Sequence, residues 1–420
     1  MKFLYDAGIS LYGFAARIAS MRGGKARMFV DGRKNAIDEL ERMTAERAPE
    51  GYDYWFHAAS LGEFEQARPL IEAIKKDTPN AKILLSFFSP SGYNVRCNYD
   101  LATTVVYLPA DTKKNASRFL EIARPRQAVF VKYEFWLNFL DALKQRNIPT
   151  YLISAIFRPG QIFFRPWGGT FRKRLEVYKC IYVQNEESAR LLGKAGIQNV
   201  RITCDTRFYR VHDIMKDGTT FGAIDAWRRD AFTLVIGSSW PQDEDRYIDW
   251  INNHPEVRVI LAPHEFDDRR IERLHECLKS PSQRWTDADM DVEGAIREDV
   301  QTLIVNTFGK LSSLYRYADV AIVGGGFGTG IHNINEAAVY GLPVLFGPNN
   351  HKFKEAGDLK NVGGGFEFKN GKELSELLDR FVKDKEYLSA ASEAAGSYIK
   401  NNLGATAVIY SDLRKDNMTD

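Results

Sequence analysis

The stretch VGGGFGTGIHNINEAAVYGLPVLFGP, residues 323–348, decides the fold of this chain. An apolar strand is expected to end at Val323, and five glycines follow it between residues 324 and 330. A helix is then expected to begin near Asn333, before a second apolar strand at residues 344–346. A strand, a glycine-rich loop, a helix and a strand in this order predict part of a parallel sheet.

The glycines also point to a ligand, because glycine lets backbone N–H groups approach a phosphate closely. The loop does not meet the dinucleotide-binding fingerprint, and it lacks the Gly-Lys-Ser/Thr ending of a P-loop. Glu336 is expected one turn into the helix, where its carboxylate can accept hydrogen bonds from two ribose hydroxyls. We therefore expect a nucleotide or a sugar phosphate here. The alternative is a flexible glycine loop without a ligand.

The rest of the chain alternates short apolar runs with helical stretches such as residues 65–75 and 136–146. Strands rich in Val, Ile and Leu between helices predict parallel sheets that are covered on both faces. Two blocks of such strands predict two doubly wound α/β domains. The expected strands are residues 54–58, 82–86, 104–108, 128–131, 150–154 and 181–183 in the first half, and 233–237, 257–262, 302–305, 320–323, 344–346 and 365–368 in the second.

The composition of the 420 residues limits the possible functions. Lys and Arg number 57 and Asp and Glu 55, so a net charge of +2 gives no case for wrapping nucleic acid. The four cysteines are scattered without a Cys-x-x-Cys pair, which argues against a structural zinc site and a disulfide framework. The histidines show no metal-binding spacing, so the sequence demands neither a metal nor a cofactor.

The first 34 residues combine apolar and aromatic residues with a basic end. Asp6 and Arg17 interrupt the apolar run, so neither a signal peptide nor a spanning helix is expected. Leu4, Leu11 and Ile18 recur at helical spacing. The segment is either an interfacial helix whose basic end meets anionic head groups, or a helix packed on its own domain.

Ligands of open α/β sheets bind beyond the carboxyl ends of the strands, and four candidates follow expected strands. Glu63 begins a helix, as a general base or as an ordinary helix-start acid. Glu134 directly follows a strand, as a functional acid or as part of a structural ion pair. The loop at residues 89–92 is either a sugar-facing loop or an ordinary turn, and His264 is either a ligand contact or structural.

Several motifs, in their order along nearly the whole chain, resemble the 3-deoxy-D-manno-octulosonic acid (Kdo) transferases of Gram-negative bacteria. No single motif carries this resemblance. The matching pieces are HAASLGE (57–63), FFSPSGY (87–93), YLPAD (107–111), YEFWLN (133–138), LISA (152–155), QNEESARLL (184–192), DTRF (205–208), IGSSWPQDE (236–244), GGGFGTGIHNINEAA (324–338) and LFGP (345–348).

The resemblance implies a GT-B fold, in which two Rossmann-like doubly wound domains face each other across a cleft, with a short N-terminal amphipathic helix. The expected parts are a basic, membrane-associating segment (1–34), an acceptor domain (35–210), a linker (211–230), a CMP-Kdo-binding domain (231–400) and a C-terminal tail or helix (401–420).

The activity that the resemblance implies is an inverting transfer of Kdo from CMP-Kdo to a lipid A precursor of the lipid IVA type. This step belongs to lipopolysaccharide core assembly at the cytoplasmic face of the inner membrane. The expected partners are therefore the CMP-Kdo donor, the lipid acceptor and the membrane surface. Neither nucleic acid nor an obligate protein partner is expected.

The resemblance also assigns roles to single residues. Glu63 matches the general base of the family, and Glu134 and Arg207 match residues proposed to stabilise the transition state. The residues that match the family's CMP-Kdo contacts are Pro263, His264, Phe308, Gly309, Lys310, Asn333, Ile334, Asn335 and Glu336.

Two departures from the family pattern concern the donor site. The common Pro-Arg-His is here Ala262-Pro263-His264, so the arginine is missing. The common Met-Gly-Glu is here Phe308-Gly309-Lys310, which reverses the charge at the third place. The alternatives to the Kdo-transferase assignment are a GT-B enzyme that uses another nucleotide sugar and a non-catalytic nucleotide-sugar-binding protein.

Overall fold

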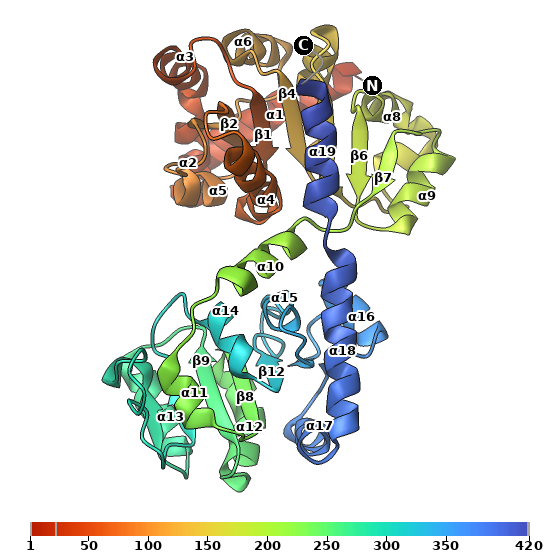
Figure 1. The fold of residues 1–420 in the computed structure, drawn as a ribbon. Coiled ribbons are helices and arrows are strands. Elements are labelled where there is room, and N and C mark those ends of the chain that lie inside the picture. The colour runs from red at the N-terminus through yellow and green to blue at the C-terminus, as the bar shows by residue number, and fades with distance from the viewer. Residues whose placement is uncertain (1, 22, 418–420) are drawn as a thin grey trace. The chain divides into compact units, whose positions relative to one another are not determined.

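The computed structural model describes residues 2–21 and 23–417 of the chain (Figure 1). Its internal contacts divide the chain into two compact units. The first unit consists of Met1–Tyr209 with Leu403–Asp420, and the second unit is Arg210–Asn402. Each unit is built on one seven-stranded parallel sheet, as the alternating sequence pattern predicts.

The sheet of the first unit has the order β3-β2-β1-β4-β5-β6-β7. All strands are parallel. Successive strands are added on one side of β1 up to β3 and on the other side from β4 onward, so β1 and β4 form the switch point of the sheet. They pair directly, from Tyr54 opposite Gln127 to His57 opposite Phe130. This switch point is where open α/β sheets bind ligands. The strands are β1 (Tyr54–Ala58), β2 (Ile83–Phe87), β3 (Thr104–Tyr107), β4 (Gln127–Val131), β5 (Thr150–Ala155), β6 (Cys180–Val183) and β7 (Val200–Ile202).

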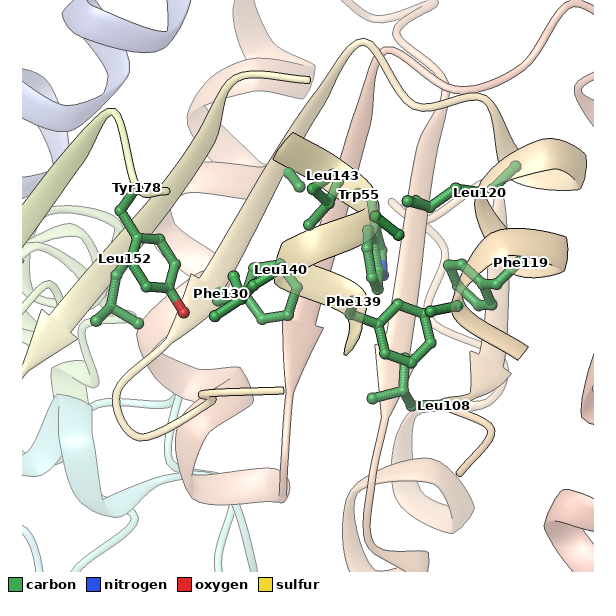
Figure 2. Packing of buried hydrophobic residues seen from close by; sticks show 14 of the residues in the cluster. Trp55, Leu108, Phe119, Leu120, Phe130, Phe139, Leu140, Leu143, Leu152 and Tyr178 are labelled. Atoms are coloured by element: carbon green, nitrogen blue, oxygen red, sulfur yellow. The ribbon is translucent and has the colours of Figure 1, made fainter. Parts of the chain in front are cut away.

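Both faces of this sheet are covered, because successive side chains of a strand point to opposite faces. Trp55 of β1 packs in one apolar cluster with Phe119, Phe130 and Phe139 (Figure 2), whereas Phe56 packs in a second cluster. The helices of the first unit are α1 (Lys2–Ser20), α2 (Gly24–Lys34), α3 (Ala36–Arg47), α4 (Leu61–Asp77), α5 (Pro90–Arg96), α6 (Lys113–Ala123), α7 (Leu137–Gln145), α8 (Gly169–Leu175), α9 (Glu186–Lys194) and α19 (Ala405–Asn417).

The last helix, α19, packs in the first unit. Ile409 and Leu413 are fully buried in the same apolar cluster as Leu70 and Ile71 of α4. The Tyr182 hydroxyl of β6 donates a hydrogen bond of 2.7 Å to Asp412. Residues far apart in the sequence therefore complete one core.

The sheet of the second unit has the order β10-β11-β9-β8-β12-β13-β14, and its switch point lies between β8 and β12. Its strands are β8 (Thr233–Ser239), β9 (Arg258–Pro263), β10 (Ser282–Arg284), β11 (Thr302–Ile304), β12 (Val320–Val323), β13 (Val344–Phe346) and β14 (Gly365–Glu367). Its helices are α11 (Gly222–Arg228), α12 (Pro241–Asn253), α13 (Asp268–Cys277), α14 (Leu311–Leu314), α15 (Asn335–Ala338), α16 (Lys354–Asn361), α17 (Gly371–Lys383) and α18 (Lys385–Asn402). Helix α10 (Arg207–Asp217) begins in the first unit and continues into the second.

Two strands have no counterpart among the expected ones. Edge strand β7 reads Val-Arg-Ile, and edge strand β10 reads Ser-Gln-Arg. Both are three residues long and are partly or fully exposed, so their apolar pattern is weak. Residues 211–230, the expected linker, include α11, which the contacts assign to the second unit.

The expected N-terminal helix is confirmed as α1, and a second helix, α2, follows it. None of the residues of α1 is buried. No helix among the described residues is both long enough and apolar enough to cross a membrane.

Phe130 gives a direct test of the core of the first unit. It is fully buried on β4, and its ring centroid lies 5.1 Å from that of Trp55. We expect Phe130→Ala to lower the free energy of unfolding by about 3–5 kcal/mol, because it removes buried area and leaves a cavity. Urea unfolding followed by circular dichroism measures this loss.

The matched control is Phe14→Ala, because Phe14 is 61% exposed on α1. It should change the free energy of unfolding by less than about 0.5 kcal/mol. Equal effects of the two substitutions would contradict the assignment of Phe130 to the core.

Candidate active site

Glu63 lies in the first turn of α4, immediately beyond the carboxyl end of β1. Ser60 takes the N-cap position of this helix, and its hydroxyl donates a hydrogen bond to the Glu63 carboxylate. The side chain is half-buried. The helix dipole stabilises its negative charge at this end of the helix.

Glu134 follows β4 at the same switch point and is almost completely buried. Its Oε2 atom lies 2.9 Å from Nε2 of His57 and accepts a hydrogen bond of 2.5 Å from the Trp136 indole N–H. Its backbone carbonyl accepts a hydrogen bond of 2.8 Å from the Tyr178 hydroxyl. Glu134 Oε1 accepts no hydrogen bond from any of the described residues, so one oxygen is held in place and the other is unengaged.

His57 makes hydrogen bonds through both ring nitrogens. Its Nδ1 atom lies 2.9 Å from the Ser86 hydroxyl, to which the Trp55 indole N–H also donates at 2.8 Å, and 3.1 Å from the Ser86 carbonyl oxygen. Its Nε2 atom lies 2.9 Å from Glu134 Oε2 and accepts a hydrogen bond of 3.0 Å from the Trp136 indole N–H. These buried contacts fix the imidazole and the Glu134 carboxyl group relative to each other.

Arg207 begins α10 and is held by Asp205. Its Nε and Nη2 atoms donate to Asp205 Oδ2 at 3.1 and 2.9 Å, and its backbone N–H donates to Oδ1 at 2.9 Å. Asp205 also accepts hydrogen bonds from Gln66 of α4 at 2.8 Å and from Gln184 at 3.1 Å. Arg207 is thus fixed against the helix that carries Glu63, while 42% of its side chain is exposed.

The structure therefore brings the three predicted residues of the first unit to the same edge of one sheet. It also reveals neighbours that the sequence analysis missed, namely His57, Tyr133 and Arg158. Burial raises the pKa of Tyr133, the charge of Arg158 lowers it, and the charge of Glu63 raises it, so both charged groups lie near the Tyr133 hydroxyl. His57 stands at the head of the quoted motif HAASLGE, but its buried partner Glu134 is distant in sequence.

The glycine loop after β12 differs from the expected phosphate cradle. The N–H of Gly324 donates to the carbonyl of Gly237 at 2.9 Å, and the N–H of Gly325 donates to Asp243 at 2.8 Å. The N–H groups of Gly328 and Gly330 donate to the carbonyl of Gly325. These four N–H groups are engaged within the protein, so they do not form an open anion site.

Close packing explains why the loop needs glycine. A Cβ atom at Gly324 would lie only 2.4 Å from the carbonyl oxygen of Ser238. Asp243 of α12 is buried, and its Oδ2 also accepts the backbone N–H of Trp240 at 2.8 Å. Burial raises the pKa of Asp243, which hydrogen bonds from Gly325 and Trp240 partly offset. This carboxylate ties the loop after β8 to the loop after β12.

An aromatic stack lies at the carboxyl edge of the second sheet. His264, which follows β9, has its ring centroid 4.6 Å from Trp240 and 4.3 Å from His332. The Trp240 indole N–H donates to His332 Nε2 at 3.1 Å, so that nitrogen is unprotonated. Burial lowers the pKa of His332, and the nearby His264 lowers it further. The sequence analysis selected His264 but not His332.

Glu336 lies in the first turn of the four-residue helix α15, not one turn into a longer helix as expected. Its carboxylate accepts hydrogen bonds of 2.9 Å from Asn333 and 2.7 Å from Ser312 of α14. Lys310 is the N-cap residue of α14, and its Nζ lies 5.6 Å from the centroid of the Phe221 ring. Lys310 and Glu336 are therefore linked through one short helix.

The other predicted donor-site residues lie in several separate segments of the second unit. Pro263 is the last residue of β9, and Phe308 is 77% exposed with its ring 4.7 Å from that of Phe266. Gly309 has a φ of 78°, in the region that favours glycine. Asn335 and Ile334 are buried at the start of α15.

No group of three or more His, Cys, Asp or Glu side chains in the described part of the chain could hold a metal ion.

Comparisons with known proteins show which proteins this chain resembles. A family model described as "3-Deoxy-D-manno-octulosonic-acid transferase (kdotransferase)" matches residues 30–210. The chain is 25% identical over 358 residues to such a transferase from Aquifex aeolicus, covering 82% of this chain and 91% of the relative. It is 26% identical over 379 residues to one from Bordetella pertussis, covering 86% of each.

Solved structures agree on the fold. The crystal structure of UDP-GlcNAc 2-epimerase from Neisseria meningitidis matches with a TM-score of 0.59 and 14% identity, over 86% of this chain and 99% of that one. MurG from Acinetobacter baumannii matches with a TM-score of 0.54 and 12% identity, over the same shares of the two chains. At these identities the likeness concerns the fold alone.

Two parallel sheets, each with polar side chains beyond its carboxyl edge, define the GT-B fold that these structures share. Within that fold, the chain is similar to the Kdo transferases, as its motifs predict. The family model covers residues 30–210, and the curated relatives extend over most of the chain.

Asp205 should make the stability of the first unit depend on pH. Burial favours a higher pKa, but the charge and hydrogen bonds of Arg207 and the amide of Gln66 hold the pKa below the ordinary 3.8. The resulting stabilisation is complete above about pH 4 and is lost as the pH falls through the lowered value. We expect Asp205→Asn to cost about 1–3 kcal/mol at pH 7 and less at pH 3.

Urea unfolding of both proteins at the two pH values measures this difference. Asp100→Asn is the control, because Asp100 is exposed and should show no such change. A penalty for Asp205→Asn that stays the same at both pH values would rule out the ionised Asp205–Arg207 pair.

Proposed function

We propose that the protein transfers a Kdo residue from CMP-Kdo to a lipid A precursor of the lipid IVA type, with inversion at the anomeric carbon. The observation that carries this proposal is Glu63 at the start of α4, beside the switch point of the first sheet. The similarity to Kdo transferases supports the donor and the acceptor class.

Glu63 acts as the general base. Its half-buried carboxylate takes the proton from a sugar hydroxyl of the acceptor as that oxygen attacks the anomeric carbon. The bond to CMP breaks in the same displacement, so the configuration inverts and no covalent enzyme intermediate is needed. The Ser60 hydroxyl, which donates to this carboxylate, holds it at the N-terminus of α4.

Charge develops on both partners of the reaction, and two further residues of the first unit match it. The Glu134 carboxyl group stabilises the oxocarbenium-like sugar through Oε1, which accepts no hydrogen bond from the described residues. Arg207 stabilises the phosphate of departing CMP, since Asp205 fixes its guanidinium while part of it stays exposed.

The second unit binds CMP-Kdo. His264, stacked with Trp240 and His332, offers flat aromatic rings to the nucleotide base. Glu336 accepts the ribose hydroxyls, and Lys310 contacts the phosphate in place of the glutamate common in the family. The remaining donor contacts are Pro263, Phe308, Gly309, Asn333, Ile334 and Asn335.

The N-terminal segment holds the enzyme at the cytoplasmic face of the inner membrane, where the lipid acceptor lies. Helix α1 exposes large apolar side chains without burying any residue. Helices of this kind bind bilayer interfaces when basic residues accompany the apolar face. The exposed apolar residues of α1 are Phe3, Leu4, Leu11, Tyr12, Phe14 and Ile18.

Glu63→Gln tests the general base. Because an amide cannot take the proton, we expect the turnover number to fall at least 100-fold, while CMP binding stays unchanged. Mass spectrometry of the lipid product after incubation with CMP-Kdo, generated in situ, and a tetra-acylated lipid A precursor measures the transfer.

Glu65→Gln is the matched control, two residues further along α4. Glu65 forms ion pairs with Arg68 and Arg96 at the surface of the unit, and the substitution should leave turnover within about twofold of the wild type, because weak surface pairs contribute little. Near-full transfer by Glu63→Gln would exclude the base. Inhibition by UDP rather than CMP would favour another nucleotide sugar as the donor.

Replacing Leu11, Phe14 and Ile18 together with serine tests the membrane contact. The three side chains are 69%, 61% and 54% exposed, so the fold should survive their replacement. We expect binding to vesicles that contain anionic lipid to fall at least tenfold, because three apolar insertions are lost. Co-sedimentation with vesicles measures it.

The control replaces the exposed valines Val95, Val292 and Val362 with serine. Vesicle binding should persist in this variant. Equal loss in both triple variants would contradict a specific role of α1.

A further inference from the structure

The first unit contains a cavity of about 1110 Å³ that the proposed chemistry does not use. Its walls come from α1, α2, the start of α3 and the loops that follow β2, β3 and β4. Most of the lining is apolar or aromatic, as in Ile9, Val30, Ile37, Phe88 and Pro109. A cavity of this size and character suits an apolar ligand.

Helix α1 is apolar on two opposite faces. Residues advance by about 100° along a helix, so Tyr5, Ile9, Tyr12 and Ala16 share one face, and all four line the cavity. The exposed residues Phe3, Leu4, Leu11, Phe14 and Ile18 share the opposite face. One face of α1 is therefore turned to the surroundings and the other to the cavity.

Asp111, one of three carboxylates that line the cavity with Asp31 and Asp38, already has hydrogen-bond partners. Asp111 accepts hydrogen bonds from the Tyr5 hydroxyl at 2.6 Å and from the backbone N–H groups of Asn138 and Phe139 at 3.1 and 3.0 Å. Burial raises its pKa, and these hydrogen bonds offset part of the rise. This group does not require a cationic ligand.

Arg33, which lines the cavity together with Arg17 and Lys34, has no such carboxylate partner. The Arg33 guanidinium lies 3.6 Å from the ring centroid of Phe29 and 4.4 Å from that of Phe88. Its Nε and Nη1 atoms donate to the carbonyls of Leu108 and Phe29, at 3.1 and 2.9 Å. Among the described residues, Nη2 finds no hydrogen-bond partner, and no carboxylate lies within ion-pair distance. Burial lowers the pKa of Arg33 to about 10, so it remains charged at neutral pH.

The cavity also adjoins the candidate active site. Trp136 lines the cavity and donates to Glu134 at 2.5 Å. Its ring centroid lies 4.8 Å from that of Phe88, which also lines the cavity. A molecule whose apolar part fills the cavity would hold its polar part near the His57–Glu134 pair.

We propose that this cavity binds an acyl chain of the lipid acceptor, and that an anionic group on the acceptor head balances the charge of Arg33. The inference rests on the proposed function, which supplies a phosphorylated, acylated acceptor. In this proposal the exposed face of α1 contacts the bilayer. The face of α1 that lines the cavity contacts an acyl chain that has moved out of the bilayer.

Photo-crosslinking tests the cavity directly. The probe is dodecyl phosphate with a diazirine at the chain end, used below its micelle concentration, and mass spectrometry maps the labelled residues. We expect labels on the cavity face of α1 and on α2, and competition by the lipid acceptor but not by phosphatidylglycerol. Labels confined to the outer face of α1, no labels, or equal competition by both lipids would overturn the proposal.

A filled cavity gives the matching variant. A Cβ atom at Gly8 or Gly13, which both line the cavity, would meet no atom within 4 Å. Gly8→Leu with Gly13→Leu should therefore fold, since leucine favours a helix over glycine. The control is Gly193→Leu in α9, where a Cβ atom also meets no atom within 4 Å. We expect the double variant to lose labelling at least tenfold and the control to keep it.

Kinetics separate this inference from the proposed function. The double variant should raise the ratio of KM for the acylated acceptor to KM for the deacylated acceptor at least tenfold. Arg33→Gln should reduce the preference of the cavity for dodecyl phosphate over dodecyl maltoside, which the same labelling measures. Unchanged ratios and preferences would refute the cavity assignment. Absence of Kdo transfer to either acceptor by the wild type would instead refute the proposed function, and the labelling would still decide whether the cavity binds a chain.

Discussion

The buried hydrogen bonds of His57 hold the first unit together at its switch point. They join β1 to Ser86 of β2 on one side and to Glu134, after β4, on the other. Because a buried polar group without a partner is costly, each member of this network limits where the others can lie. The same hydrogen bonds orient Trp136, so they shape both the acidic site and the wall of the apolar cavity. The candidate active site and the adjoining apolar cavity thus depend on one buried imidazole.

In the second unit, the buried polar side chain at the switch point is the carboxylate of Asp243. Asp243 accepts N–H groups from the loops that follow β8 and β12, the two strands at its switch point. In both units one buried polar residue therefore makes hydrogen bonds to neighbouring segments at the switch point of the sheet. The loops can then carry functional side chains at defined positions, because their backbone is already fixed.

The sequence predicts the frame of the molecule well and the contacts within it less well. Twelve strands can be predicted from apolar runs. Strands β7 and β10 cannot, because each has only three residues, all partly or fully exposed, and therefore shows no clear apolar pattern. Glu63 can be selected from its place after a strand. The hydrogen bonds of His57 to Glu134 and of Gln66 to Asp205, which holds Arg207, cannot be predicted, because only the fold brings these residues together. The expected phosphate-binding role of the glycine loop after β12 differs from the structure for a related reason. A glycine-rich sequence is compatible both with an anion site and with close backbone packing. Only the hydrogen-bond partners of the loop N–H groups distinguish the two.

The return of α19 to the first unit has a consequence for biosynthesis. Ile409 and Leu413 fill a core whose other members lie before residue 183. The first unit therefore emerges from the ribosome with part of that core open, and it stays open while the whole second unit is translated. Chains that fold during synthesis expose such surfaces to aggregation and to chaperones. Nearly 200 residues must be added before the first unit can close, so its folding is coupled to translation of the second.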